Sequence, residues 1–353
     1  MRSRVFILIA IAAAAAVFAA TQLVANNYVF FAGYVVLQFV VLATAWNILG
    51  GYCGYVNFGS AAFFALGAYS AVALHKFDPG KPIEVCVQFA FLIERLQVNL
   101  GCYHLDVSFL APVFPLPIPA LIVAGGIVSG IVGFGMGYLT LRLRGSFFAI
   151  ATLALAVVLQ TLIVNWDYVG GSRGAYVIRP ANLEVFGHQI PYIEYLFLLM
   201  LMLAALAVFI ARTIERSRLG FGFATIRDDE LAAEASGVPT LRLKLIATTI
   251  SGALMGMAGA PFPYYIGYLE PSSAFGLAYA VNSIAMPMIG GTGTWIGPLV
   301  GALLLGTIQQ VATVTISSAV NLLIVGVLLV AFVIIAPNGL VGFIEQRRRA
   351  KVQ

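Results

Sequence analysis

Residues 211–244, ARTIERSRLGFGFATIRDDELAAEASGVPTLRLK, decide the fold because they form the longest charge-dense segment in a chain that is otherwise almost uncharged. Long apolar runs flank this segment on both sides. A charged side chain at the centre of a bilayer costs about 2.5–3.5 kcal/mol, so the segment must lie in water. Its excess of Arg and Lys predicts that it faces the cytoplasm.

The rest of the chain has the composition of a membrane protein. Of its 353 residues, 61% are hydrophobic and 9% are charged, whereas soluble domains have about 25% charged residues. Residues 5–75 and 271–344 contain no Asp, Glu, Lys or Arg, and each stretch is long enough for several membrane spans of about 20 residues. We therefore predict an all-α, polytopic membrane protein with a single transmembrane domain, residues 1–353.

The apolar runs predict ten spans. These cover residues 5–24, 28–49, a stretch of 50–72 opened by a glycine-rich turn, 119–140, a run that begins at 145, 191–210, 245–265, the two sides of a glycine-rich turn at 290–297, and 319–336. The first run follows Arg2 and Arg4 and also fits a cleaved signal peptide, in which case nine spans remain. With ten spans, fourteen of the nineteen Lys and Arg residues lie in the cytoplasm, as do both termini.

Residues 76–117 form a polar, proline-rich insert on the outer side of the membrane. Within it, residues 85–98 could form a short amphipathic helix. Cys86 and Cys102 also lie in the insert, and a disulfide between them would stabilise the fold by about 3 kcal/mol in the chain-entropy account. Two separate thiols are the alternative, because the sequence does not give the distance between them.

A short helix is predicted within the charged cytoplasmic loop, residues 212–244. Asp228 and Asp229 offer carboxylates for its N-terminus, and residues 230–236 are rich in helix formers. Gly237 can end the helix in a left-handed conformation, and Pro239 prevents it from continuing. Such a helix, with small alanine faces, suits insertion into a groove of another protein. The alternative is a solvated loop that merely joins two spans.

Small and polar residues mark contacts within the membrane. GxxxG motifs allow helices to pack closely, and they occur at Gly126 and Gly130, Gly133 and Gly137, and Gly252 and Gly256. Five polar residues are candidates for lining a translocation path: Asn57, Ser60, Gln160, Asn282 and Ser283. The alternatives are helix capping for the first two and a hydrogen bond to a neighbouring helix for Gln160.

The sequence contains no constellation expected of a catalyst. Its three histidines have no metal-ligand spacing, and it has no nucleotide-binding P-loop. No predicted span carries an ionisable residue at its centre, which disfavours an ion-coupled carrier. We predict no catalytic residue, metal, cofactor or nucleic-acid partner, so the energy for transport must come from another protein. A stand-alone carrier or channel, an intramembrane enzyme and a passive structural subunit are the rival functions.

Residues 226–245, IRDDELAAEASGVPTLRLKL, resemble the coupling loop of the permease subunits of bacterial ABC importers. The resemblance is closest to the branched-chain amino acid permease family of the LivM type. The general pattern is Glu-Ala-Ala, three residues, then Gly, and it is matched by Ala232, Ala233 and Gly237. Leu231 stands where the general pattern has Glu. The resemblance extends over residues 28–342, apart from the insert at 76–117.

The resemblance implies an ABC importer permease with a type II-like architecture in the bacterial inner membrane. Its partners would be a second homologous permease, two cytoplasmic ATPases that bind the ATP, a periplasmic solute-binding protein and membrane lipid. The solute would be a branched-chain or other hydrophobic amino acid, with urea, short amides and aromatic acids as alternatives. The residues implied in coupling to the ATPases are Asp228, Asp229, Glu230, Ala232, Ala233, Glu234 and Gly237.

Overall fold

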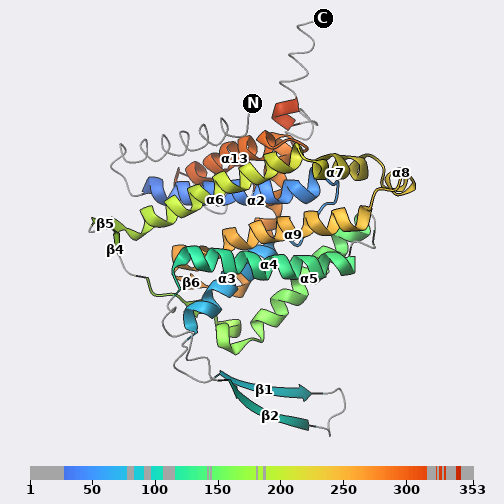
Figure 1. Ribbon diagram of the computed structural model, residues 1–353. Helices are drawn as coiled ribbons and strands as arrows, with labels where there is room; N and C mark the ends of the chain where they lie inside the picture. The colour runs from blue at the N-terminus through green and yellow to red at the C-terminus, as the bar shows by residue number, and fades with distance from the viewer. Residues whose placement is uncertain are drawn as a thin grey trace, which may run out of the picture.

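The computed structural model describes residues 28–77, 83–90, 97–105, 116–140, 143, 145–179, 182–185 and 188–315, together with scattered positions between 323 and 342. Most of these residues are helical, and the long helices pack side by side as a bundle (Figure 1).

Seven of the described helical segments are long and apolar enough to cross a membrane. They are α2 (Tyr28–Gly50), α4 (Ile118–Thr140), α5 (Ser146–Val164), α6 (Tyr192–Glu215), α9 (Thr240–Gly259) with α10 (Phe262–Ile266), α11 (Pro271–Ala274) with α12 (Leu277–Gly290), and α13 (Ile296–Thr315). The 17-residue α3 (Ser60–Lys76) lies where the third span is predicted. The predicted spans at 5–24 and 319–336 fall outside the described residues, so the total of ten stays a prediction.

Short elements gather at the two ends of the bundle. After α5 come η2 (Asp167–Val169), η3 (Gly171–Arg173), β3 (Ala175–Tyr176), β4 (Asn182–Val185) and β5 (His188–Pro191). β3 pairs antiparallel with β6 (Tyr268–Leu269), and β4 pairs with β5. At the opposite end of α6 lie α7 (Arg218–Asp228) and α8 (Glu230–Ala235) (Figure 1). Because the charged loop is predicted to face the cytoplasm, we call the end with α7 and α8 the inner end and the end with the short strands the outer end.

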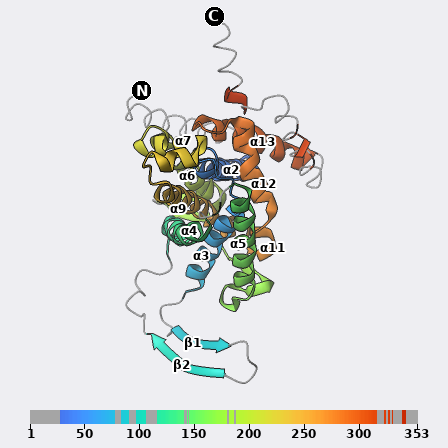
Figure 2. The same cartoon turned by 90° about the vertical axis from the view of Figure 1, so that its right-hand side faces the viewer.

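The insert contains a β-hairpin, so the prediction of an amphipathic helix at residues 85–98 is wrong. β1 (Ile83–Ala90) and β2 (Gln97–Leu105) pair antiparallel, and the hairpin lies clear of the helices in two perpendicular views (Figure 1, Figure 2). The sequence of β1, IEVCVQFA, places an apolar residue at every second position. That alternation is the pattern of a strand and favours a strand over a helix at these residues.

The register of the hairpin favours the disulfide, because it places Cys86 directly opposite Cys102. Opposed residues of an antiparallel pair have Cα atoms about 4.5–5.5 Å apart, which lies within the range of Cα separations that a disulfide spans. Protein unfolded in detergent without reductant should therefore take up one maleimide-polyethylene glycol, on Cys53, and all three cysteines should react after reduction. Cys86→Ser is the control, in which two thiols should react with or without reductant. Three adducts on unreduced wild type would contradict the disulfide.

The GxxxG motifs pack helices together as predicted. At Gly256 of α9, an added Cβ atom would lie 2.2 Å from Ser129 Oγ and 2.6 Å from the Gly125 carbonyl oxygen, both on α4. A Cβ atom on Gly67 of α3 would lie 1.9 Å from the Gly256 carbonyl oxygen. Ser129 Oγ also donates a hydrogen bond of 3.0 Å to the carbonyl of Phe63, which links α4 to α3. Three helices therefore meet at Gly256 with no room for a side chain.

Candidate functional site

The inner end carries a helix, α7, that we did not predict from the sequence. It begins after Ser217, whose Oγ accepts a hydrogen bond of 3.2 Å from the backbone nitrogen of Leu219. It buries Phe223 and Ile226 against the bundle. Leu219, Phe223 and Ile226 recur at intervals of four and three residues, which is the spacing of one helix face. A serine cap before such a face is the signal that could have predicted α7. We call residues 218–239, which comprise α7, α8 and the turn after α8, the coupling unit.

The start of α8 is confirmed in part. Asp229 is its N-cap, and Oδ1 accepts hydrogen bonds from the backbone nitrogens of Leu231, at 2.9 Å, and Ala232, at 3.0 Å. The predicted capping role of Asp228 is wrong, because α7 continues through Asp228, whose carboxylate lies 3.4 Å from the Arg227 guanidinium. The break between the two helices falls on Asp229, whose backbone is extended.

The end of α8 is confirmed at Gly237, which has a φ of +81°. Its amide donates to the carbonyl of Glu234 at 3.0 Å, and the amide of Val238 donates to the carbonyl of Ala233 at 3.0 Å. These two bonds are the Schellman arrangement at a helix C-terminus. Thr240 Oγ1 donates to Glu234 Oε1 at 2.8 Å, so the Glu234 side chain also joins α8 to the first turn of α9.

The two sides of α8 differ in exposure. Ala233 faces the bundle and is 5% exposed, whereas Leu231 is 62% exposed. The small residues Ala232, Ala235 and Ser236 are exposed as well. The coupling unit therefore presents one large apolar side chain among small ones, which is a surface that a groove of another protein can receive.

Glu230 turns away from this surface into a buried polar cluster. Its Oε1 lies 2.6 Å from Lys244 Nζ, and its Oε2 accepts a hydrogen bond from the Tyr55 hydroxyl. Lys244 Nζ donates to the Tyr55 oxygen at 3.2 Å and lies 4.8 Å from the centre of the tyrosine ring. The side chains of Lys244 and Glu230 are only 3% and 14% exposed. Removal of one partner would leave the other charge buried without a partner, and this would lower the free energy of unfolding by about 3–5 kcal/mol.

The helices on both sides of the charged loop extend beyond the apolar runs that predict the spans. The apolar run at 245–265 begins after Lys244, and α9 starts at Thr240, where a segment that enters the membrane was predicted to begin. Lys244 therefore lies within α9, where Glu230 neutralises it. The span at 191–210 was expected to end before Arg212, but α6 continues to Glu215. The Arg212 guanidinium lies 5.5 Å from the centre of the Trp295 ring, which provides a favourable cation–π contact.

Glu215 ties the end of α6 to two glycine-rich turns. Its Oε2 accepts a hydrogen bond of 2.6 Å from the backbone nitrogen of Trp295, in the turn before α13. The same oxygen accepts a bond of 3.3 Å from the Tyr52 hydroxyl, in the turn before α3. Arg227 of α7 donates a bond of 3.5 Å to the carbonyl of Gly51 in that turn. The inner ends of several spans and the coupling unit are thus joined by polar contacts.

A cavity of about 440 Å³ lies between the coupling unit, the turn before α3 and the start of α5. Its lining mixes apolar groups with polar ones, among them Cys53, Tyr55, Ser146, Arg227 and Glu230. The buried cluster therefore borders an open space at the inner end, and a change in the cluster would alter access to the cavity walls.

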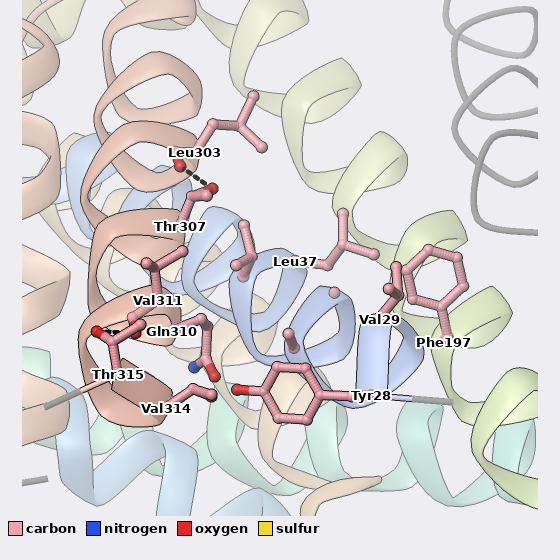
Figure 3. A pocket seen from close by; sticks show the side chains of 13 residues that line it. Tyr28, Val29, Leu37, Phe197, Leu303, Thr307, Gln310, Val311, Val314 and Thr315 are labelled. Atoms are coloured by element: carbon pink, nitrogen blue, oxygen red, sulfur yellow. Dashed lines mark hydrogen bonds between the residues drawn. The ribbon is translucent and has the colours of Figure 1, made fainter. Parts of the chain in front are cut away.

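A second cavity of about 440 Å³ lies between α2, α6 and α13 (Figure 3). Its lining is almost wholly apolar, with residues such as Val29, Leu37 and Phe197. The hydroxyls of Thr307 and Thr315 donate to carbonyls of their own helix, at 2.6 and 2.9 Å. This cavity offers few polar groups to a solute and suits an apolar occupant.

Residues 28–333 match the family model described as "Branched-chain amino acid transport system / permease component". The chain belongs to this permease family. The high-affinity branched-chain amino acid transport system permease proteins LivM of Salmonella typhimurium and Escherichia coli are each 25% identical to it over 335 residues, which cover 89% of this chain and 70% of theirs. The probable branched-chain amino acid transport permease protein LivH of Methanocaldococcus jannaschii is 25% identical over 240 residues, 64% of this chain and 74% of its own. No solved structure matches the chain.

Family membership confirms the predicted class. The permease is a multi-pass membrane protein and the transport subunit of an ABC importer, so it works with other ABC components. The individual coupling roles of Asp228, Asp229, Glu230, Ala232, Ala233, Glu234 and Gly237 stay predictions.

Two of the permease's candidate path residues contact each other between two helices. Ser60 Oγ at the start of α3 and Ser283 Oγ in α12 lie 2.8 Å apart, and both side chains are buried. Asn282 Oδ1 accepts a hydrogen bond of 2.9 Å from Gln309 Nε2, which joins α12 to α13. These bonds give each residue a packing role within the permease.

The other two candidates lie elsewhere. Asn57 Oδ1 accepts a hydrogen bond of 2.7 Å from the backbone nitrogen of Gly59, in the turn before α3. The N-cap of α3 is Gly59 and no side chain caps this helix, so the capping alternative for Asn57 and Ser60 is wrong. Gln160 is half-buried on α5. Along that helix it lies about 12 Å beyond Thr152, whose Oγ1 accepts a bond of 3.2 Å from the backbone nitrogen of Phe58. The path-lining role of all five residues stays a prediction.

Proposed function

We propose that the permease forms one half of a transmembrane path that imports branched-chain or other hydrophobic amino acids. The support is the matched family and the relatives, which are named for branched-chain amino acid transport. A second homologous permease forms the other half, and a periplasmic binding protein delivers the solute to the outer end. Urea, short amides and aromatic acids are the alternative solutes. The subunit has ten spans in a type II-like arrangement in the bacterial inner membrane, with both termini in the cytoplasm.

Two cytoplasmic ATPases supply the energy and bind the ATP, so the permease itself needs no cofactor and catalyses no reaction. The coupling unit is the observation that carries this proposal. It is a short capped helix with Leu231 exposed among small residues, and it lies at the end of the bundle where Arg and Lys are concentrated. Hydrolysis in the ATPases displaces this helix and exposes the path alternately to the two sides of the membrane.

Leu231→Arg is expected to release the ATPases, because it places a charge at the centre of an apolar docking surface. The tagged permease variant, purified from cells that make the whole transporter, should retain less ATPase than wild type by about tenfold or more. Ser272→Arg adds the same charge at an exposed position of α11, at the outer end, and should retain the wild-type amount. Equal ATPase recovery with both variants would contradict the docking surface.

A further inference from the structure

Two side chains of α8, Glu230 and Glu234, attach it to the bundle. Of the six residues of α8, the structure buries Ala233. Glu230 instead reaches the buried cluster and lies 2.6 Å from Lys244 of α9. Tyr55 of the same cluster packs edge-on against Phe148 of α5, with 5.1 Å between ring centres. The cluster therefore joins α8 to α9, to α5 and to the turn before α3.

We propose that Glu230, Lys244 and Tyr55 form a latch that transmits the displacement of α8 into the membrane spans. The proposal rests on the proposed function, in which the ATPases move α8. The three residues position the helix and do not touch the solute. Without the latch, the Glu234–Thr240 bond would still join α8 to the first turn of α9, but less of the displacement of α8 would reach the spans.

The first element that the latch would move is α9. Lys244 and Gly256 stand on this helix, about 18 Å apart along its axis at 1.5 Å per residue. Gly256 is the point where α9 meets α3 and α4 without space for a side chain. A pull on Lys244 therefore shifts a helix that cannot move independently of its neighbours.

The second element that the latch would move is α3. Tyr55 lies in the turn that leads into this helix, five residues before Ser60. Ser60 in turn bonds to Ser283 of α12 at 2.8 Å. Displacement of Tyr55 thus acts on the α3–α12 contact, where two of the candidate path residues meet.

The geometry of the latch suits transmission better than an ordinary surface ion pair does. The Lys244–Glu230 pair is short and shielded from water, so its attraction is little screened. The Arg227–Asp228 pair of the same unit has a separation of 3.4 Å, with side chains 41% and 74% exposed. Exposed pairs of that kind contribute little, so of these two ion pairs the buried one is the effective connection.

Cys53 provides a built-in reporter of the latch. It is fully buried and lines the cavity that Tyr55 and Glu230 also line. Burial raises the pKa of its thiol to about 12, and the Lys244 ammonium lowers that pKa while the Glu230 carboxylate raises it. The thiol is therefore almost unreactive at neutral pH while the latch is closed. Opening of the latch would expose it to water and to reagents.

The test uses the complete transporter in proteoliposomes with leucine as the probe solute. Glu230→Gln and Lys244→Met should keep the ATPases bound and hydrolysing ATP within about twofold of wild type, while leucine moved per ATP falls about tenfold. Tyr55→Phe, which removes one hydroxyl, should lower the same ratio by a smaller factor. Glu270→Gln removes a carboxylate at the outer end as a charge-matched control and should leave the ratio unchanged.

A second readout uses Cys53 as the only thiol, in a Cys86→Ser, Cys102→Ser background. Glu230→Gln should raise the rate of N-ethylmaleimide labelling by about tenfold, and Glu270→Gln should not change it. An unchanged ratio of leucine to ATP in Glu230→Gln would overturn the latch. So would loss of the ATPases with unchanged Cys53 labelling, because Glu230 would then be a docking residue.

If Glu230→Gln does not fold, Tyr55→Phe decides the question, and normal coupling in that variant overturns the latch. Failure of the proposed function has a different signature. In that case the wild-type complex shows no ATP-driven leucine uptake, whereas Cys53 labelling, which needs no transport, still reports whether Glu230 holds the latch closed.

Discussion

Replacement of Gly256 with leucine is expected to prevent the permease from accumulating as a folded membrane protein. An added Cβ atom alone would lie 2.2 Å from Ser129 Oγ and 2.6 Å from the Gly125 carbonyl oxygen. Overpacking of a core usually lowers the free energy of unfolding by about 1–3 kcal/mol. Here part of the obstruction is backbone, so relief requires the separation of α4 from α9, and the loss should exceed that range. The yield of monodisperse protein on size-exclusion chromatography in detergent should fall by about tenfold or more.

Gly135→Leu is the matched control for Gly256→Leu. Gly135 lies on α4, the helix that Gly256 of α9 contacts, but no heavy atom lies within 4 Å of the position that its Cβ would take. The same substitution there should leave the yield close to that of wild type. If Gly256→Leu eluted as a single peak at the yield of Gly135→Leu, the close meeting of α3, α4 and α9 would be wrong.

Gly237→Val is expected to abolish most solute uptake while the permease still inserts in the membrane. The φ of +81° at Gly237 costs a residue with a Cβ atom about 1–2 kcal/mol, and a β-branched residue tolerates it least. Because no neighbouring heavy atom lies within 4 Å of the added Cβ, the penalty comes from the backbone alone. The turn that holds the end of α8 would open, and uptake by the reconstituted transporter should fall about tenfold.

Gly237→Asn separates conformation from bulk. Asparagine adopts the left-handed conformation more readily than other residues with side chains, so this variant should keep at least about half of the wild-type uptake. If the valine variant transported normally, the turn would have no part in coupling. If asparagine were as damaging as valine, the cause would be obstruction of a docking partner rather than the backbone of the turn.

The features that the sequence predicted well depend on local chemistry. Long apolar runs must be helical in lipid, because a helix satisfies every backbone hydrogen bond within itself, and the described spans lie close to their predicted positions. The cap at Asp229 and the left-handed stop at Gly237 involve neighbours within a few residues, so they too could be predicted. The alternation of β1 and the single apolar face of α7 are local signals of the same kind.

The buried cluster and the Ser60–Ser283 contact could not be predicted because they bring together residues that are far apart in the chain. Lys244 and Tyr55 are separated by 189 residues, and Ser60 and Ser283 by 223. From composition alone, Lys244 counts as a charge that must lie in water, whereas the fold supplies Glu230 as its partner.

The central claim is that a separate ATPase drives transport through the coupling unit of this subunit. The most direct measurement is leucine accumulation in proteoliposomes that hold the permease with its second permease, the two ATPases and the binding protein. We expect accumulation with ATP, none when the ATPases are left out, and none with Leu231→Arg. Accumulation of leucine by vesicles that contain this subunit as their sole protein, without nucleotide, would contradict the account.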